Sequence, residues 1–358
     1  MKVLVITENL GSGGAERQLS GLAVFLKRKG YDVKVITYLK RQFYEDFLKE
    51  NSVDYELHEE LLPKLKRIWR MIKLLKRIKP DVVISFLPSV NKTMCIVRFF
   101  IRFYLIVSER SHTQVFDFRT KLGFLLYKKA DRIVANSKSE VNNIVSHIPS
   151  LRKKLIAIPN FVDVNLFIPN ELENRSKKLN ILCVGRVIPS KNLLRFIDAV
   201  AIVVSKGYEF NVCWAGHQYD KLYLENVRKR ILQYNLQETI TLLGQCENIV
   251  KEYQKADVFC LPSLFEGYPN VLVEAMSCRL PVICSNVCEN PLIVEDGING
   301  FLFNPNDTIS IANSIEKLLK MSHKERIDMG FRNREKIINN NSIDSFVNQY
   351  IKLIDYGN

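Results

Sequence analysis

The stretch Glu266-Gly267-Tyr268-Pro269-Asn270-Val271-Leu272-Val273-Glu274 carries the strongest fold signal in this chain. It follows Val258-Phe259-Cys260-Leu261, an apolar run that predicts a short buried strand. Pro269 suits the first turn of a helix, and the apolar face of that helix continues through Ala275. The sequence therefore predicts a strand that ends near Glu266 and a helix that carries Glu274.

The start of this helix has the chemistry of a phosphate site. Its backbone N–H groups are unpaired and lie at the positive end of the helix dipole, and both features suit an anion. The Glu266 and Glu274 carboxylates would hold sugar hydroxyls beside the phosphate. Two glutamates at this spacing also occur in ordinary helical proteins, so the segment alone leaves a structural role open. If it binds substrate, the contacts are expected from Gly267, Tyr268, Pro269, Asn270, Val271 and Leu272.

A second predicted strand-to-helix loop carries two cations. Leu182-Cys183-Val184-Gly185-Arg186 reads as a strand that runs into a turn, and Lys191 follows five residues later, before a helical pattern that starts near Leu194. An arginine can contact a diphosphate in a bidentate manner, and a lysine adds a compact point charge. We therefore expect Arg186 and Lys191 to clamp a diphosphate beside Gly185.

The ordered combination of these motifs resembles a known family. Further pieces are Pro281-Val282-Ile283-Cys284, the segment 289–302 and Gly13-Gly14-Ala15-Glu16 near the N-terminus. Together they are similar to the family 4 glycosyltransferases, which are retaining enzymes that use nucleotide sugars. The resemblance implies an α/β fold of the GT-B type, in which two Rossmann-like domains face each other across an interdomain cleft.

The resemblance also implies roles for residues of the first half. Gly13 and Gly14 would form a loop whose amides approach the donor phosphates and the acceptor. In Ser108-Glu109-Arg110-Ser111-His112, Glu109 and His112 stand where many relatives have a catalytic His-Asp pair. This sequence departs from that pair, and His112 comes two positions late, so a loop histidine without function stays open. Asn160 lies in a segment that resembles the family's Pro-Asn-Gly-Val-Asp turn.

A dinucleotide cofactor is not expected. In Gly11-Ser12-Gly13-Gly14-Ala15-Glu16, Glu16 occupies the place of the third glycine of the nicotinamide-binding fingerprint. The next predicted strand ends in Thr37-Tyr38-Leu39-Lys40, which offers no carboxylate to a ribose. The sequence thus predicts an enzyme without a cofactor.

Alternating strand and helix patterns run through both halves of the chain. Strands are predicted at Val3–Thr7 and Val33–Thr37 and again from Ile181 onward, which indicates parallel sheets covered on both faces. We expect a first, acceptor-side domain over residues 1–168 and a second, nucleotide-sugar-binding domain over 169–342. The polar stretch Pro169 to Asn180 would link them. By family resemblance, residues 343–358 would form a helix that crosses back to the first domain.

The positive charge lies entirely in the first half. Residues 1–170 contain 30 Lys and Arg against 16 Asp and Glu, whereas residues 171–358 contain 22 of each. The segment Lys64–Lys79 places eight basic residues around an apolar stripe at helical spacing that includes Leu65, Ile68 and Trp69. One interpretation is a core-facing helix with a solvated basic side. The other is a dock for an anionic membrane.

The sequence gives little support for a membrane span, a secretory signal or a metal site. No run of 18 uncharged apolar residues occurs, and the apolar run at the N-terminus is too short for a secretory signal. Most of the eight cysteines lie in apolar runs, which is typical of a reducing cytoplasm. Cys278, Cys284 and Cys288 match no usual zinc spacing. We therefore expect no metal, and a protein attached peripherally to the inner face of the cytoplasmic membrane.

Together with these motifs, the resemblance implies a hexosyltransferase. It would move a hexose or N-acetylhexosamine, with retention and without a divalent metal, from a nucleotide diphosphate sugar, UDP-linked in our expectation. The acceptor would be a glycan, lipid-linked, in cell-surface polysaccharide synthesis. Two alternatives remain. One is a basic protein that binds membranes or nucleic acid, although no nucleic-acid motif supports nucleic acid as a partner. The other is a sugar phosphorylase or epimerase on the same fold.

Overall fold

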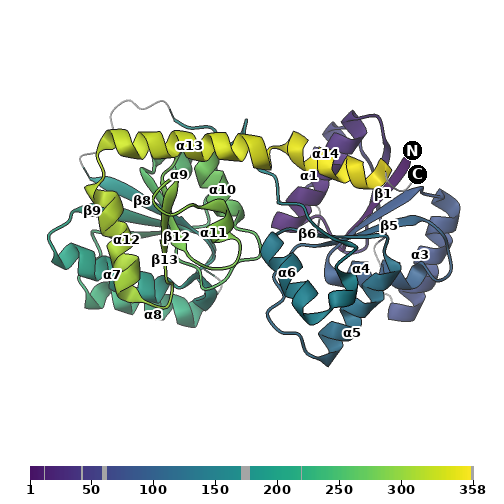
Figure 1. Cartoon of the computed structure of the whole chain (residues 1–358), viewed down its shortest axis with the longest axis horizontal. Helices are drawn as coiled ribbons and strands as arrows, with labels where there is room; N and C mark the ends of the chain where they lie inside the picture. Colours follow the sequence, from purple (N-terminus) through teal and green to yellow (C-terminus); the bar gives the residue numbers. More distant parts are fainter. Residues whose placement is uncertain (12, 42, 59–62, 171–177, 219, 356–358) are drawn as a thin grey trace. The chain divides into compact units, whose positions relative to one another are not determined.

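The structure is a computed structural model of the 358-residue chain, and it describes residues 1–11, 13–41, 43–58, 63–170, 178–218 and 220–355. The chain divides into two compact units (Figure 1). The N-terminal unit combines Met1–Phe161 with Ile343–Asn358, and the C-terminal unit is Val162–Ser342. Each unit is described by itself below.

A parallel sheet forms the centre of the N-terminal unit. Within the described residues it has seven strands in the order β3-β2-β1-β4-β5-β6-β7. Apolar residues dominate the central strands, which are buried on both faces as expected for a parallel sheet. The strands are β1 (Lys2–Ile6), β2 (Asp32–Thr37), β3 (Asp54–Leu57), β4 (Val82–Phe86), β5 (Tyr104–Glu109), β6 (Arg132–Ala135) and β7 (Leu155–Ala157).

Two helical layers cover this sheet and make two cores. One core is shared by α3 (Lys64–Ile78), α4 (Pro88–Val97), α5 (Phe118–Leu126) and α6 (Lys138–His147). The other is shared by α1 (Gly14–Arg28), α2 (Glu45–Glu50) and α14 (Ile343–Asp355). Short 3₁₀ turns η1 (Tyr127–Lys129) and η2 (Pro149–Leu151) complete the unit.

The apolar stripe predicted for α3 is only partly buried. Met71, Ile72, Leu74 and Leu75 pack in the core, and Ile68 is half-buried. Leu65 and Trp69 instead point to solvent, with 75% and 63% of their surface exposed. The core contacts therefore come mainly from the second half of this helix.

The C-terminal unit repeats the same plan. Its described residues form a six-stranded parallel sheet in the order β10-β9-β8-β11-β12-β13. The strands are β8 (Leu179–Val184), β9 (Phe210–Ala215), β10 (Ile240–Gly244), β11 (Val258–Leu261), β12 (Val282–Ser285) and β13 (Gly300–Phe303).

Helices again cover both faces of this second sheet. One core includes side chains of α7 (Leu193–Ser205), α8 (Lys221–Gln233) and α12 (Thr308–Lys320). The opposite core includes side chains of α9 (Ile249–Lys255), α10 (Asn270–Ser277), α11 (Asn290–Ile293) and α13 (His323–Asn341). The 3₁₀ turn η3 (Pro189–Lys191) precedes α7.

Two expectations need adjustment in detail. Pro269 is the N-cap of α10 rather than its first helical residue. The division between the units lies after Phe161, earlier than the expected boundary at residue 168, because Val162 and Phe167 already pack in the C-terminal core. Most of the expected linker falls at residues 171–177, outside the described residues.

A buried arginine holds α14 in the N-terminal unit. Arg110 follows β5, donates hydrogen bonds to Asn160 Oδ1 (2.9 Å) and to the hydroxyl of Tyr350 from α14, and stacks over the Phe86 ring at 4.8 Å. Burial lowers the pKa of Arg110. The last helix is thereby fixed at the end of β5, in the core that α1 also lines.

Candidate active site

Both sheets reverse their strand order at one place, and the predicted motifs lie there. In the C-terminal unit β8 has β9 on one side and β11 on the other. The loop after β8 carries Gly185, Arg186 and Lys191, and the loop after β11 carries the segment 266–269. Ligands of open α/β sheets bind at such a switch point, beyond the carboxyl ends of the strands.

The two loops of this switch point are tied together. Lys191 Nζ lies 2.5 Å from Glu266 Oε1, and Ser263 Oγ donates to the same oxygen at 2.6 Å. The backbone N–H of Leu264 donates to Ser190 O at 2.9 Å. The half-buried Lys191 and Glu266 side chains thus form one polar cluster, which the sequence motifs did not show as a pair.

Gly185 leaves room for the side chain of Lys191. A Cβ at Gly185 would lie 3.3 Å from Cδ and Cε of Lys191, so the aliphatic stem runs directly over the glycine. Arg186, next along the chain, is exposed and forms no ion pair with another described residue. One cation of the expected clamp is therefore already paired with a carboxylate, whereas the other is open to an anion.

Glu274 lies in α10 and is buried, with 4% of its surface exposed. The Tyr253 hydroxyl of α9 donates to Glu274 Oε2 at 2.9 Å and lies 3.2 Å from the carbonyl oxygen of Val271. Tyr268 is buried as well, and its hydroxyl is hydrogen-bonded to Asn341 Nδ2. The hydroxyl of Tyr253 therefore orients the Glu274 carboxylate from within the C-terminal unit.

The glycine loop of the N-terminal unit lies at the corresponding switch point, between β1 and β4. Gly13 is the N-cap of α1, and Gly14 is its first residue. The Glu16 carboxylate folds back over Gly13, where any Cβ would collide with it. Burial raises the pKa of Glu16. A carboxylate thus already lies at the start of α1, where the resemblance places donor and acceptor contacts.

Glu109 ends β5 and is a buried carboxylate, with 2% of its surface exposed. Its Oε1 atom accepts hydrogen bonds from the Tyr127 hydroxyl and from Asn91 Nδ2, the latter at 3.1 Å. Burial raises the pKa of Glu109 to about 6, although both donors act in the opposite direction. This carboxyl therefore changes charge close to neutral pH.

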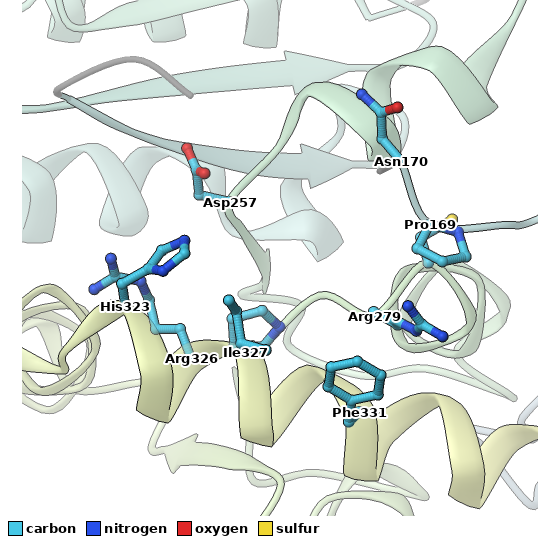
Figure 2. A pocket seen from close by; sticks show the side chains of 10 residues that line it. Pro169, Asn170, Asp257, Arg279, His323, Arg326, Ile327 and Phe331 are labelled. Atoms are coloured by element: carbon cyan, nitrogen blue, oxygen red, sulfur yellow. The ribbon is translucent and has the colours of Figure 1, made fainter. Parts of the chain in front are cut away.

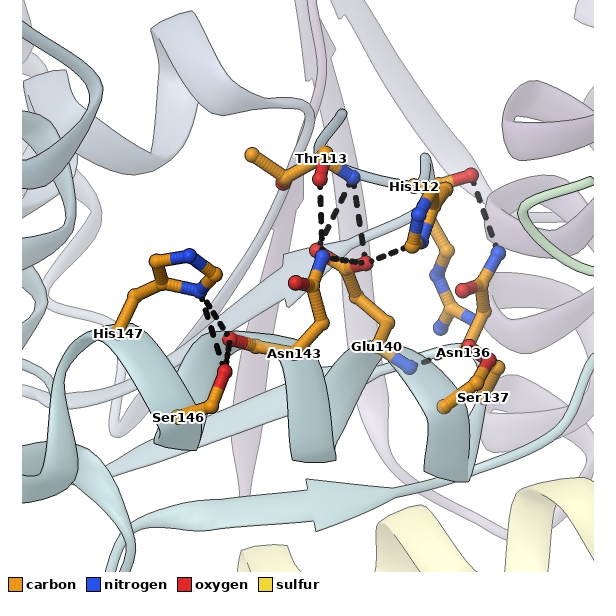
Figure 3. A network of polar contacts seen from close by, with 10 residues as sticks. His112, Thr113, Asn136, Ser137, Glu140, Asn143, Ser146 and His147 are labelled. Atoms are coloured by element: carbon orange, nitrogen blue, oxygen red, sulfur yellow. Dashed lines mark hydrogen bonds and ion pairs between the residues drawn. The ribbon is translucent and has the colours of Figure 1, made fainter. Parts of the chain in front are cut away.

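His112 is held by a second buried carboxylate (Figure 3). Its Nδ1 atom lies 2.7 Å from Oε2 of Glu140 in α6, and this interaction raises the pKa of His112. Glu140 also accepts from the backbone N–H of Thr113 (3.2 Å) and from Asn143 Nδ2 (3.2 Å). The imidazole is thus oriented by a network, in contrast to a free loop histidine.

The sequence did not identify several partners in these networks. Glu140, Tyr253 and Ser263 come from other elements or stand alone in the chain, so spacing gives no signal for them. Asn192 could have been suspected as the residue after the Lys191 motif. It adopts φ +60° and donates to Pro262 O at 3.1 Å and Pro305 O at 2.8 Å, which fixes the loop after β8.

No group of three or more His, Cys, Asp and Glu side chains that could hold a metal ion is found among the described residues. This holds also for Cys278, Cys284 and Cys288. Burial raises the pKa values of Cys278, to about 12, and of Cys284. These two thiols are accordingly core side chains.

A small hollow elsewhere in the C-terminal unit is separate from these loops (Figure 2). Its volume is about 70 Å³, and its lining includes Asp257, Pro281, Arg279 and His323. Asp257 directly precedes β11, and Pro281 directly precedes β12. The hollow is therefore at the amino ends of the strands, opposite the loops that carry the motifs.

Comparison with known proteins identifies the family. Residues 12–166 match the model described as Glycosyltransferase Family 4, and residues 165–341 match the one described as Glycosyl transferases group 1. The chain belongs to the family 4 glycosyltransferases. The expected glycosyltransferase family is confirmed.

Relatives of similar length carry related names. An α-1,4-N-acetyl-D-galactosaminyltransferase of Campylobacter jejuni, named for a GalNAc-containing glycan on diphospho-undecaprenol, is 26% identical over 95% of this chain and 92% of its own. The capsular polysaccharide biosynthesis glycosyltransferase CapM of Staphylococcus aureus is also 26% identical, over 93% of this chain and 94% of its own.

Solved structures confirm the GT-B-type fold of this glycosyltransferase. A glycosyltransferase from Rickettsia africae has a TM-score of 0.87 at 18% identity and covers 99% of this chain and 98% of its own. The Anabaena protein HepE, solved in complex with UDP, has the same TM-score and identity and covers 99% of this chain and all of its own. At this identity the likeness concerns the fold alone.

Proposed function

We propose that this glycosyltransferase moves a hexose or N-acetylhexosamine, with retention, from a UDP-sugar to a lipid-linked glycan in cell-surface polysaccharide synthesis. The observation that carries the proposal is the polar cluster at the C-terminal switch point, where Lys191 meets Glu266 next to the exposed Arg186. The names of the Campylobacter relative and of the Anabaena complex support the choice of acceptor and nucleotide.

The departing diphosphate is the centre of the proposed chemistry. Arg186 and Lys191 neutralise it, and backbone N–H groups at the start of α10, such as that of Val271, bind its oxygens, whereas those of Asn270 and Leu272 already donate to backbone carbonyls. Glu274 accepts hydrogen bonds from the ribose hydroxyls. Its carboxylate is oriented for this by the hydrogen bond from the Tyr253 hydroxyl. Glu266 holds the donor sugar or orders the loop. Gly13 and Gly14 approach the donor phosphates and the acceptor from the N-terminal unit.

Retention follows from attack on the face from which the diphosphate leaves. A donor phosphate oxygen takes the proton of the acceptor hydroxyl, so no protein nucleophile is required. Two cationic side chains supply the charge that a divalent cation would otherwise supply. Transfer is accordingly expected to persist in excess chelator, and loss of activity in EDTA with recovery in magnesium or manganese would contradict this part.

The proposed attachment is peripheral, at the cytoplasmic face of the cytoplasmic membrane. Leu65 and Trp69 are exposed one turn apart on α3, beside the exposed Lys66 and Lys73. Tryptophan and basic side chains favour the interface of an anionic bilayer. In the same helical layer, the α5 residues Phe118, Leu122 and Leu125 are also exposed. No helix of the described residues is long and apolar enough to cross a membrane.

The test begins with the donor. Binding of UDP, GDP and a panel of nucleotide sugars is measured by calorimetry, and transfer is followed by mass analysis with a synthetic diphospholipid-linked N-acetylhexosamine as acceptor. Binding of UDP and its sugars in preference to GDP, with one added hexose or N-acetylhexosamine in the product, is the expected result. Absence of nucleotide binding, or a product with phosphate on the sugar, would overturn the proposal.

A further inference from the structure

The side chain of Asn192 joins the loops that follow three different strands of the C-terminal sheet. Its Nδ2 atom donates to Pro262 O at 3.1 Å and to Pro305 O at 2.8 Å. Pro262 directly follows β11 and Pro305 is the second residue after β13, whereas Asn192 ends the loop after β8. In the sheet, β8 and β13 are not neighbours, because β11 and β12 lie between them. A single buried carboxamide therefore connects loops that the strand pairing leaves apart.

The backbone at Asn192 restricts this position to few residue types. It has φ +60° and ψ +30°, in the left-handed region that glycine adopts freely and that asparagine and aspartate tolerate. Glycine has no donor for the two carbonyl oxygens, and aspartate would turn a carboxylate towards them. Of these three residues, asparagine alone combines the conformation with an amide that donates twice. Asn192 is also the N-cap of α7, but its side chain makes no capping bond to that helix.

The carboxamide of Asn192 is held on its other side as well. Arg195, in the first turn of α7, donates from Nη1 to Asn192 Oδ1 and to Pro305 O, both at 3.1 Å. Both protons of the amide nitrogen and one lone pair of the amide oxygen are therefore used. A buried amide that is paired in this way has little freedom to rotate, so it keeps the three loops at a fixed spacing.

This connection lies next to the ion pair of Lys191 and Glu266. Lys191 precedes Asn192 in the chain, and Ser263, whose hydroxyl donates to Glu266 Oε1 at 2.6 Å, follows Pro262. The hydrogen bond from Asn192 to Pro262 thus sets the spacing between the two backbone segments that carry the pair. The position of the Lys191 ammonium depends on this spacing, because the ammonium lies between its own loop and the loop after β11.

We propose that Asn192 is a positioning residue of the diphosphate clamp, which holds the backbone of Lys191 where its ammonium can turn from Glu266 to a bound diphosphate. Asn192 itself is buried and acts through Lys191. The inference rests on the proposed donor site and names a further residue on which that site depends. Without the carboxamide, Lys191 keeps its charge, but its backbone is no longer tied to the loops after β11 and β13.

The experiment is a double-mutant cycle of Asn192→Gly and Lys191→Met in the full chain. Calorimetry measures the binding of UDP and GDP, and the cycle uses the one that the wild type binds more tightly. Asn192→Gly removes the carboxamide and leaves the left-handed backbone conformation accessible. Asn235→Gly is the matched control, because Asn235 also has a positive φ, +54°, but is exposed and precedes β10, away from the clamp.

A milder variant covers the case in which Asn192→Gly does not fold, which urea unfolding reveals. Arg195→Met leaves Asn192 in place and removes the guanidinium that donates to its Oδ1 atom. Asn192→Gly is expected to weaken nucleotide binding about tenfold and Arg195→Met about threefold, whereas Asn235→Gly should change it by less than about twofold. In the Lys191→Met background, Asn192→Gly should cost less than a further factor of about two, because the residue through which it acts is absent.

Transfer kinetics separate positioning from a general loss of stability. In Asn192→Gly the KM for the nucleotide sugar should rise about tenfold, while the KM for the diphospholipid-linked acceptor stays unchanged. A protein that is merely less stable would have a lower kcat and both KM values unchanged. Equal losses of affinity with and without Lys191, or unchanged affinity in both Asn192→Gly and Arg195→Met, would overturn this inference alone. Absence of UDP and GDP binding by the wild type would overturn the proposed donor site together with it.

Discussion

At the scale of single residues, the cluster around Lys191 sets a condition on donor binding. Its ammonium is neutralised by Glu266, so an arriving diphosphate competes with a carboxylate for the same cation. The lysine stem runs over Gly185, where a larger residue would bring a Cβ within 3.3 Å of it. We infer that the exposed Arg186 makes the first contact with the donor and that Lys191 is recruited afterwards.

The two cations should differ when they are removed. Lys191→Met and Arg186→Met should each cost about 2–4 kcal/mol of transition-state stabilisation, a fall in kcat/KM of roughly 30- to 1,000-fold. Lys191→Met should also lower the free energy of unfolding, because it leaves the half-buried Glu266 without its cation. Arg186→Met should change that free energy by less than about 0.5 kcal/mol, since its side chain is exposed. Near wild-type turnover in either variant would show that the substituted residue does not belong to the diphosphate clamp.

Glu274 can be tested by removing its charge alone. Glu274→Gln should weaken UDP binding by about 10- to 150-fold, which corresponds to the 1.5–3 kcal/mol of a hydrogen bond to a charged group. Calorimetry with UDP measures this. Tyr253→Phe is the control, because it removes the internal donor and should lower stability by about 1–3 kcal/mol with a smaller effect on UDP. Unchanged UDP affinity in Glu274→Gln would exclude the ribose role.

The titration of Glu109 gives a prediction for stability. Its pKa in the folded protein is about 6, above the ordinary 4.5, so the folded state binds this proton more readily than the unfolded state. The carboxyl therefore destabilises the protein increasingly as pH rises from about 4.5 to 6, by on the order of 2 kcal/mol in total. Glu109→Gln should be relatively more stable at pH 7 than at pH 4.5, as measured by urea unfolding at both values. An equal difference at the two pH values would contradict the raised pKa.

At the scale of elements, the central strands of the N-terminal sheet could be predicted from sequence and its two edge strands could not. The expected Val33–Thr37 agrees with β2 within one residue because its apolar run is buried on both faces. By contrast β3, with the sequence Asp-Tyr-Glu-Leu, is an edge strand with half-exposed side chains, and β7 has only three residues. These two edge strands lack the buried run that identifies a parallel strand from sequence.

The candidate site was predictable to the same extent. Arg186, Lys191 and Glu266 were identified because each follows an apolar run that becomes a central strand. Their mutual arrangement was not, since the Lys191–Glu266 pair joins positions 75 residues apart. The exposure of Leu65 and Trp69 was left open between a core-facing helix and a membrane dock, because periodicity shows which residues share a helix face but not whether another element covers it.

The last helix offers a test at this scale. Tyr350→Phe removes the hydroxyl that accepts from the buried Arg110, and we expect a loss of about 1.5–3 kcal/mol in the free energy of unfolding. Tyr31→Phe removes a surface hydrogen bond to Asp355 on the same helix and should cost less than about 0.5 kcal/mol. Chemical denaturation of both variants measures the difference. Equal stability of the two would mean that α14 is held by apolar packing alone.

At the scale of the whole molecule, the net positive charge is confined to the first half of the chain. All of the net charge of +14 comes from residues 1–170. The exposed apolar side chains Leu65, Trp69, Phe99 and Phe100 lie in the same stretch. The combination of basic and exposed apolar side chains is the one that peripheral membrane proteins use.

We expect the protein to co-sediment with vesicles that contain anionic lipid and to be released by salt, as the Debye length falls from about 10 Å at 0.1 M to about 3 Å at 1 M. Changing Lys66, Lys73 and Lys76 to Gln should weaken binding, and Trp69→Ala should weaken it further. The control changes Lys221, Arg228 and Lys229 of α8 to Gln and should have no effect. Vesicle binding that is unchanged by salt and by the three substitutions in α3 would indicate attachment by apolar insertion. Absence of vesicle binding would mean that α3 is an ordinary surface helix.

The split composition of the N-terminal unit has a consequence for biosynthesis. Its core needs Phe346, Val347, Tyr350 and Ile354, which the ribosome adds after the whole C-terminal unit, and that unit is contiguous in sequence. During translation the C-terminal unit can therefore fold first. Until α14 is synthesised, the apolar face of α1 that packs against it stays exposed. We expect nascent chains stalled before residue 343 to recruit chaperones and to be cleaved by proteases in their first 161 residues, with the segment 162–342 resistant.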